Sequence, residues 1–306
     1  MGTKVKTAVK VGSLELANPV LAASGTFGYG REFAKYLDLN RLGGVVTKGL
    51  SLEPRDGNPP PRIVETAAGM LNAIGLANVG AEVFLEEKLP FLAALDCKVV
   101  VNLYAEGIDQ FAGLAERLRG AEGIDALEIN VSCPNVKGGG VAFGVDPISV
   151  AAVTRAVREN SDLPVWVKLT PNVTDPVPIA LAAQKAGAEA LSLINTIMGM
   201  AIDARRRTPR LANVMGGLSG PAIKPVGLRM VHLVSRAVDI PVVGLGGIMT
   251  GEDAAEYLLA GATAVQVGTA SFGDPSSCQR VADELAQFCA QEGVADVNEL
   301  VGALKT

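Results

Sequence analysis

The sequence predicts one α/β domain, residues 1–306, folded as a closed (β/α)8 barrel. Two observations favour this fold. Short apolar runs alternate with amphipathic helical patterns along the whole chain, and eight of these runs suit parallel strands covered on both faces. No stretch rich in Pro or Ser divides the chain into halves. A doubly wound open sheet is the alternative, but no G-x-G-x-x-G motif follows the first strand.

The predicted elements follow one another with a regular rhythm. A hairpin, Val5–Val11 and Ser13–Leu16, is expected to close the bottom of the barrel. The eight predicted barrel strands are Val20–Ala23, Gly44–Thr47, Lys98–Asn102, Ala126–Asn130, Val165–Leu169, Ala190–Ile194, Pro241–Leu245 and Ala264–Val267. Apolar residues recur at helical spacing in Ile108–Arg119, Val150–Asn160, Pro178–Ala186, Val226–Val238 and Ala254–Ala260. Two insertions, Ser51–Leu76 and Met198–Pro225, are expected to be loops on the C-terminal face, where barrels carry active sites.

Composition excludes several classes of protein. The net charge is −5 and no cluster of Lys and Arg forms a basic face, so a nucleic-acid partner is not expected. No apolar run approaches the ~18–20 residues of a membrane span. Residues Met1–Lys10 lack the apolar core of a signal peptide. We therefore expect a reduced, cytoplasmic protein.

The spacing of the cysteines and the single histidine does not predict a metal site. Cys97, Cys133, Cys278 and Cys289 are scattered without a C-x-x-C pair, so neither zinc nor a cysteine-ligated iron–sulfur cluster is expected in this chain. His232 lies in a predicted helix and is interpreted as structural, and the cysteines other than Cys133 as packing residues.

Polar residues follow most of the predicted strands. Because the carboxyl ends of barrel strands converge, these side chains should meet in one cavity. They are Ser24, Lys48, Asn102, Asn130, Lys168, Asn195 and Thr196, and Gly49 directly follows Lys48. Each lysine follows a buried run, so its charge needs an anionic or electron-rich partner. The asparagines offer donors and acceptors that suit a planar, amide-rich ligand.

Glycines follow the last two strands. Gly244-Leu-Gly-Gly247 and Gly268-Thr269 can expose backbone N–H groups beside a helix N-terminus, which favours a phosphate-bearing ligand. Glycines also end strands without binding anything, so this pattern alone leaves a structural role open.

Cys133 stands out among the thiols. It follows the strand Ala126–Asn130, precedes Pro134, and leads into Gly138-Gly139-Gly140. Proline biases Cys133 toward an extended backbone, and the glycine run can move. A thiol at a strand end beside such a loop suits proton chemistry, and a buried packing role is the alternative.

Several motifs resemble one family over nearly the whole chain. They are Asn72-Ala-Ile-Gly-Leu76, Glu128-Ile-Asn-Val-Ser-Cys-Pro-Asn135, Val167-Lys-Leu-Thr-Pro-Asn172, Gly244-Leu-Gly-Gly247 and Val267-Gly-Thr269. The chain resembles class 1 dihydroorotate dehydrogenases. Val136–Phe143 and Asn72-Ala-Ile look like the NAD-dependent class 1B catalytic subunit, whereas class 1A differs in both places.

The resemblance implies a TIM barrel that binds FMN and dihydroorotate. It implies FMN contacts at Ser24, Lys48, Gly49, Asn102, Asn130, Lys168, Ile194, Gly220, Gly246, Gly247, Gly268 and Thr269. It implies substrate contacts at Lys48, Asn72, Ala73, Ile74, Gly75, Leu76, Asn130, Asn195 and Thr196. Cys133 matches the active-site base, and no metal is implied.

The activity implied by the resemblance is the oxidation of (S)-dihydroorotate to orotate in pyrimidine (UMP) biosynthesis. Hydride would pass from C6 to FMN N5 while Cys133 removes a proton from C5. The resemblance also implies a partner subunit carrying FAD and a [2Fe–2S] cluster that delivers electrons to NAD+. A homodimer of this chain within a heterotetramer is expected.

Other functions remain as alternatives at this point. A class 1A enzyme would use fumarate as its acceptor. A tRNA-dihydrouridine synthase shares the barrel, FMN and a cysteine, but needs a basic RNA-binding surface. A flavin-free phosphosugar isomerase or aldolase would use the same glycines, and a non-catalytic barrel leaves the polar strand ends unexplained.

Overall fold

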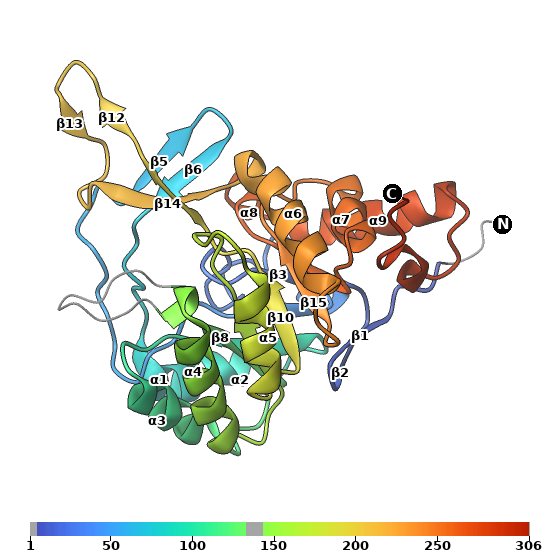
Figure 1. Cartoon of the computed structure of the whole chain (residues 1–306), viewed down its shortest axis with the longest axis horizontal. Coiled ribbons are helices and arrows are strands. Elements are labelled where there is room, and N and C mark those ends of the chain that lie inside the picture. The colour runs from blue at the N-terminus through green and yellow to red at the C-terminus, as the bar shows by residue number, and fades with distance from the viewer. Residues whose placement is uncertain (1–4, 133–142, 306) are drawn as a thin grey trace.

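A closed barrel of eight parallel strands forms the centre of the computed structural model, which describes residues 5–132 and 143–305 (Figure 1). Around the barrel the strands are β3 (Val20–Ala22), β4 (Gly44–Val46), β7 (Lys98–Leu103), β8 (Ala126–Asn130), β9 (Val165–Lys168), β10 (Ala190–Leu193), β15 (Val242–Leu245) and β16 (Ala264–Val267), with β16 pairing back to β3. Each agrees with its predicted range to within one residue. The predicted barrel is confirmed.

Helices surround these strands and bury their apolar stripes against them. They are α3 (Ile108–Leu118), α4 (Pro147–Glu159), α5 (Val177–Lys185), α6 (Lys224–Ser235), α7 (Gly251–Leu259), α8 (Ala270–Gly273) and α9 (Ser277–Gln291). A further helical stretch runs through α1 (Gly80–Val83), a π-helical turn at Phe84–Lys88, and α2 (Leu89–Leu92). Sequence reasoning did not identify α8, α9 or this stretch. No helix among the described residues is long and apolar enough to cross a membrane.

The N-terminal hairpin is shorter than predicted. Only β1 (Val9–Val11) and β2 (Leu14–Leu16) pair, so extending the first strand back to Val5 was wrong. Lys6 instead bridges to Asp296 near the end of the chain. The turn of the hairpin rests at the amino end of β10, where the Ser13 hydroxyl donates to Glu189 at 2.6 Å. The hairpin therefore lies at the bottom of the barrel, as expected.

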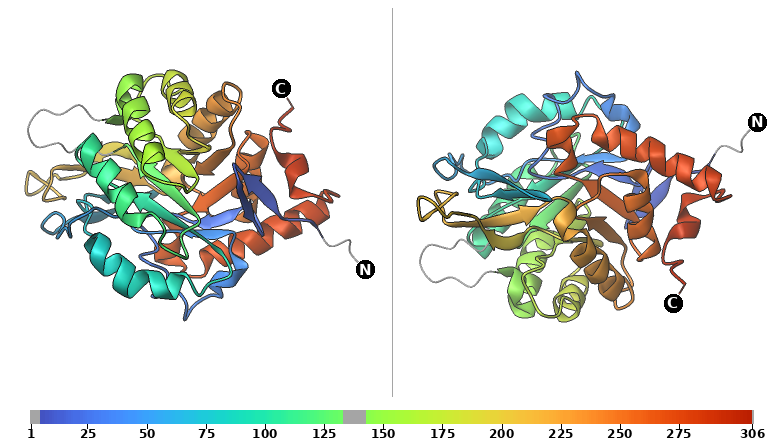
Figure 2. Two further views of the ribbon diagram at one scale, coloured as in Figure 1. Left: turned by 90° about the horizontal axis from the view of Figure 1, so that it is seen from below. Right: turned by 90° about the horizontal axis from the view of Figure 1, so that it is seen from above.

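The two insertions are strands rather than loops. Residues in the first form β5 (Ile63–Thr66) and β6 (Gly69–Asn72), and those in the second form β11 (Ile197–Met200), β12 (Ile202–Asp203), β13 (Thr208–Pro209) and β14 (Met215–Ser219). Four of them make an antiparallel sheet in the order β11-β14-β6-β5. Figure 2 shows these hairpins projecting together from one side of the molecule. Because β6 pairs with a strand that is distant in sequence, no local pattern revealed the sheet.

The interior of the barrel is apolar at its lower end and polar at its upper end. Residues two apart on a strand share a face, so Ala126, Glu128 and Asn130 of β8 all face the same side. Asn102, Glu128, Lys168, Ser192 and Gln266 are all buried. Five of the eight strands therefore contribute a buried polar side chain near the carboxyl ends, directly below the site described next.

Candidate active site

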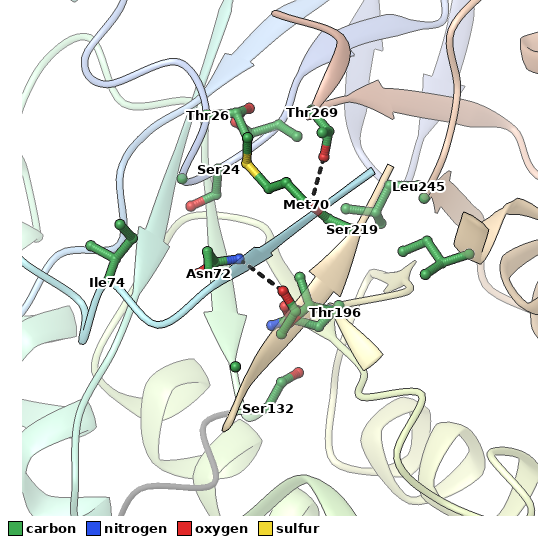
Figure 3. Close-up of a pocket in the computed structure, with 18 of the residues that line it drawn as sticks. Ser24, Thr26, Met70, Asn72, Ile74, Ser132, Thr196, Ser219, Leu245 and Thr269 are labelled. Carbon is green, nitrogen blue, oxygen red and sulfur yellow. Dashed lines mark hydrogen bonds between the residues drawn. The ribbon is translucent and has the colours of Figure 1, made fainter. Parts of the chain in front are cut away.

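A cavity of about 390 Å³ opens at the carboxyl ends of the barrel strands. The sheet formed by β11, β14, β6 and β5 contributes one wall, and the loops after the barrel strands contribute the others. Figure 3 shows Ser24, Met70 and Thr269 gathered in one part of the cavity, and Asn72 and Thr196 in another. Residues far apart in the sequence thus meet in one site.

Backbone N–H groups are available at one end of this cavity. Within the described ranges, those of Gly246, Gly247, Gly268 and Thr269 donate no hydrogen bond to another residue. Gly246 and Gly247 have φ angles of 127° and 73°, which favour glycine. A Cβ at Gly247 would lie 2.8 Å from the carbonyl oxygen of Gly220. The glycines therefore permit a close turn whose free N–H groups suit an anionic phosphate.

The N-terminus of α7 is capped by side chains of the protein itself. The N-terminus of that helix is closed by its own capping box, in which Thr250 and Asp253 exchange hydrogen bonds. The carboxylate of Asp253 also accepts from Met249 N at 2.8 Å. The phosphate site stays a prediction: the capped end of α7 has few N–H groups to offer, whereas the glycine turns have free ones, and Gly268-Thr269 directly precede α8.

Lys48 places an uncompensated charge in the cavity. Its ammonium group makes no ion pair or hydrogen bond within the part of the chain that the structure describes. Burial, and secondly the positive charge of Arg62, lowers the pKa of Lys48 below its ordinary value. A cation held in this way gains most from an anionic ligand, because the protein itself supplies no partner.

Lys168 differs from Lys48 in having a carboxylate partner. Its Nζ lies 3.8 Å from Oε1 of Glu128, and both side chains are buried. Glu128 was not among the predicted site residues. The signal was present, because a glutamate within the apolar run Ala126–Val131 has to be paired when it is buried.

A chain of hydrogen bonds fixes the polar groups at the carboxyl ends of β8 and β10. Asn195 Nδ2 donates to Asn130 Oδ1 at 3.1 Å, and Asn195 Oδ1 accepts from the backbone N–H of Thr196 at 2.7 Å. The backbone N–H of Ser132 also donates to Asn130 Oδ1, at 3.2 Å. Since its oxygen is already used, Asn130 is left with its NH₂ group to offer to a ligand.

The inserted sheet meets these groups across the cavity. Asn72 Nδ2 donates to the carbonyl oxygen of Gly217 on β14 at 3.4 Å. An added Cβ at Gly217 would overlap the Thr196 side chain, so the close approach of β14 to Thr196 requires glycine. The hydroxyl of Thr269 donates to Ser219 Oγ at 2.8 Å, which joins the same strand to the turn after β16 (Figure 3).

Every predicted cofactor or substrate residue within the described ranges lines this one cavity. They are Ser24, Lys48, Gly49, Asn72, Ala73, Ile74, Gly75, Leu76, Asn102, Asn130, Lys168, Ile194, Asn195, Thr196, Gly220, Gly246, Gly247, Gly268 and Thr269. Cys133 lies outside the described residues. Ser132, the residue before it, lines the cavity.

Other lining residues escaped the sequence reasoning. Met70 and Ser219 lie on the inserted sheet, whose pairing was not foreseen, whereas Gln266 interrupts the apolar strand Ala264–Val267 and could have been noticed.

Cys97, Cys278 and His232 do not line the cavity. Burial raises the pKa of the Cys97 and Cys278 thiols to about 12. Among the described residues, no group of three His, Cys, Asp or Glu side chains could hold a metal ion.

The fold and the cavity define a (β/α)8-barrel protein with a ligand site at the carboxyl ends of its strands. A family model described as "Dihydroorotate dehydrogenase" matches residues 6–289. A solved structure titled "Crystal structure of DHODH in complex with ferulenol from Eimeria tenella" has a TM-score of 0.82 and 24% identity, and the match covers 97% of this chain and 88% of that one. At that identity the likeness supports the fold alone.

Curated relatives are much more similar in sequence. "Dihydroorotate dehydrogenase B (NAD(+)), catalytic subunit" of Geobacter sp. (strain M21) is 58% identical over 297 residues, 97% of each chain. The protein of that name from Desulforudis audaxviator (strain MP104C) is 57% identical over 300 residues, 98% of each chain. The chain belongs to the dihydroorotate dehydrogenase family, whose members are oxidoreductases. The resemblance found in the sequence is confirmed.

Proposed function

We propose that this chain oxidises (S)-dihydroorotate to orotate in de novo pyrimidine (UMP) biosynthesis, as the single-domain, FMN-binding catalytic subunit of a cytoplasmic class 1B enzyme. One observation carries the proposal. A single cavity gathers every described residue that the resemblance assigns to FMN or to substrate. Relatives that carry this name match almost the full length of the chain.

The residues present fit FMN. The free N–H groups of Gly246, Gly247, Gly268 and Thr269 would hold its phosphate, together with Gly220. Further residues would hold the ring and ribityl parts, namely Ser24, Lys48, Gly49, Asn102, Asn130, Lys168 and Ile194. When bound, FMN supplies an acceptor for two electrons as hydride. Lys48 and Lys168 bring positive charge to the cavity, which favours an electron-rich ligand.

Dihydroorotate offers a carboxylate and a planar ring of amide groups. The residues that would hold it are Lys48, Asn130, Asn195, Thr196 and the segment Asn72 to Leu76. The Lys48 ammonium is free to meet the carboxylate, and the Asn130 amide can donate to a ring carbonyl. Their mutual hydrogen bonds fix Asn130, Asn195 and Thr196 before substrate arrives, which lowers the cost of orienting it.

Oxidation removes a hydride from C6 of the substrate and a proton from C5, and the C5=C6 double bond of orotate forms. Cys133 accepts the proton in this proposal, as its thiolate. Because a free thiol has a pKa of about 8.5, the rate should rise with pH toward that range. A partner subunit that holds FAD and a [2Fe–2S] cluster would supply the route for the two electrons to NAD+, inside a heterotetramer built on a homodimer of this chain.

The proposal is tested by supplying alternative electron acceptors to the purified chain. Dihydroorotate should be oxidised with NAD+ only when the iron–sulfur flavoprotein subunit is added, and fumarate should not replace NAD+. Turnover with fumarate alone would favour the class 1A activity. Cys133→Ser should lose most activity near neutral pH, because an unactivated hydroxyl is a far poorer base. An unchanged rate in that variant would remove Cys133 from the mechanism.

A further inference from the structure

Glu128 is a buried carboxylate that none of the roles above explains. Its side chain is 0% exposed on β8, inside the barrel. Asn102 Nδ2 donates to Oε1 at 2.7 Å, while Ser192 Oγ and Gln266 Nε2 donate to Oε2 at 2.7 and 2.8 Å. The ammonium of Lys168 lies 3.8 Å from Oε1. Three donors and one cation, from four other strands, therefore surround a single negative charge.

This carboxylate determines how two amide side chains are oriented. A carboxylate only accepts hydrogen bonds, so Asn102 and Gln266 must present their NH₂ groups to Glu128. Their other atoms, Asn102 Oδ1 and Gln266 Oε1, are buried and have no partner within the described part of the chain. Both residues line the cavity. Glu128 itself does not line the cavity. It nevertheless fixes the orientation of these two amides, because it turns their acceptor oxygens away from its own carboxylate.

Glu128 also balances the charge of Lys168. Lys168 and Lys48 both line the cavity, and for Lys48 the described chain supplies no counter-charge. Glu128 is buried in the barrel interior and does not line the cavity, but it lies 3.8 Å from Lys168. Its negative charge therefore reduces the positive potential that Lys168 exerts in the cavity. In a low-dielectric interior such a change in charge acts strongly over a few ångströms.

We propose that Glu128 is a positioning residue that lowers the redox potential of bound flavin by holding Lys168 and the amides of Asn102 and Gln266 in place. This inference rests on the proposed function, because it requires FMN in the cavity. Glu128 acts through these neighbours rather than by touching substrate. Replacing its charge should therefore change the potential of the flavin even where the fold and the flavin content remain.

The test compares the flavin potential of the wild-type holoenzyme with that of Glu128→Gln. With the negative charge removed, Lys168 is no longer balanced and electron uptake is favoured. The equilibrium should move toward reduced flavin by about tenfold, which is about 30 mV for a two-electron couple. Glu189→Gln is the matched control, because it also removes one carboxylate charge, but at the amino end of β10, where Glu189 accepts from Ser13 and does not line the cavity. Its potential should remain that of wild type.

A second variant covers the case in which Glu128→Gln does not fold or retain flavin. Ser192→Ala removes one donor from the carboxylate and leaves every charge in place, so the negative charge of Glu128 becomes less screened. The flavin potential should then fall, and the ratio of reduced to oxidised flavin at equilibrium should decrease about threefold. Potentials unchanged from wild type in the variants that retain flavin would overturn the proposal. A wild-type protein without flavin would instead contradict the proposed function.

Discussion

Lys168 Nζ lies 3.8 Å from Glu128 Oε1, and both side chains are buried inside the barrel. Lys48, which follows β4, has no such partner among the described residues. Two lysines that look equivalent in the sequence therefore differ in the structure. The charge of Lys168 belongs to a network within the protein, and that of Lys48 is left for a ligand.

Removing the Lys168 ammonium should destabilise the protein. Lys168→Met leaves Glu128 buried without a counter-charge, and breaking a buried pair in this way costs about 3 kcal/mol. Urea denaturation of the flavin-free protein measures the free energy of unfolding. Lys224→Met is a control, since Lys224 pairs with Asp253 and Glu256 in a more exposed setting and should cost less. Equal stability of wild type and Lys168→Met would mean that the pair is not needed for folding.

Orotate affinity should depend on the protonation of Lys48. Because the pKa of Lys48 is lowered, its ammonium loses the proton at a lower pH than an exposed lysine does. An anionic ligand needs the protonated form, so affinity should be highest below this lowered pKa and should fall as pH rises through it. Calorimetric titration with orotate across the alkaline range measures the effect.

The matched variant for that titration is Lys48→Met. Its orotate affinity should be about tenfold weaker than that of wild type at neutral pH, the usual scale for losing a charge-assisted hydrogen bond, and should lose the alkaline decline. Full affinity in Lys48→Met, or the same decline in both proteins, would exclude Lys48 as the anion partner.

Tyr257 should support flavin binding from below the glycine turn. Its hydroxyl donates to the carbonyl oxygen of Gly246 at 2.7 Å, and burial raises its pKa above the ordinary value. Tyr257→Phe leaves that carbonyl unsatisfied, at a cost of about 1 kcal/mol, so FMN should dissociate several-fold more readily. Fluorescence titration of the apoprotein with FMN gives the Kd. Tyr36→Phe, at an exposed position, should bind as wild type does, and an unchanged Kd in Tyr257→Phe would refute this role.

Gly217 should be required for substrate binding rather than for flavin binding. A Cβ at this position would lie 2.6 Å from Cβ of Thr196 and would displace that side chain. Gly217→Ala should raise the KM for dihydroorotate by about tenfold, because Thr196 loses its fixed position. Gly273→Ala is the control, since its Cβ would meet nothing within 4 Å. A normal KM in Gly217→Ala would show that Thr196 does not contact the substrate.

The barrel could be predicted from the sequence because each strand is a short apolar run followed by polar residues, a local signal. Lys98–Leu103 and Ala126–Asn130 show this pattern clearly. The sheet that joins β6 to β14 could not be predicted in this way. Its strands are short and partly exposed, and their pairing joins Asn72 to Gly217, which lie far apart in the chain.

The site residues were identified through converging strand ends and through the family resemblance, and those within the described ranges meet in one cavity. The network around Glu128 was not identified. Its partners come from β7, β9, β10 and β16, and only the closed barrel brings Asn102, Ser192 and Gln266 to the same carboxylate. Sequence spacing carries no information about such a contact.

The most direct measurement is an anaerobic titration of the purified chain with dihydroorotate while the flavin absorbance is followed. We expect a yellow protein that releases about one FMN per chain, and whose absorbance is bleached by about one equivalent of dihydroorotate with formation of orotate. A colourless protein that takes up no FMN, or bound flavin that dihydroorotate does not bleach, would contradict the proposed function.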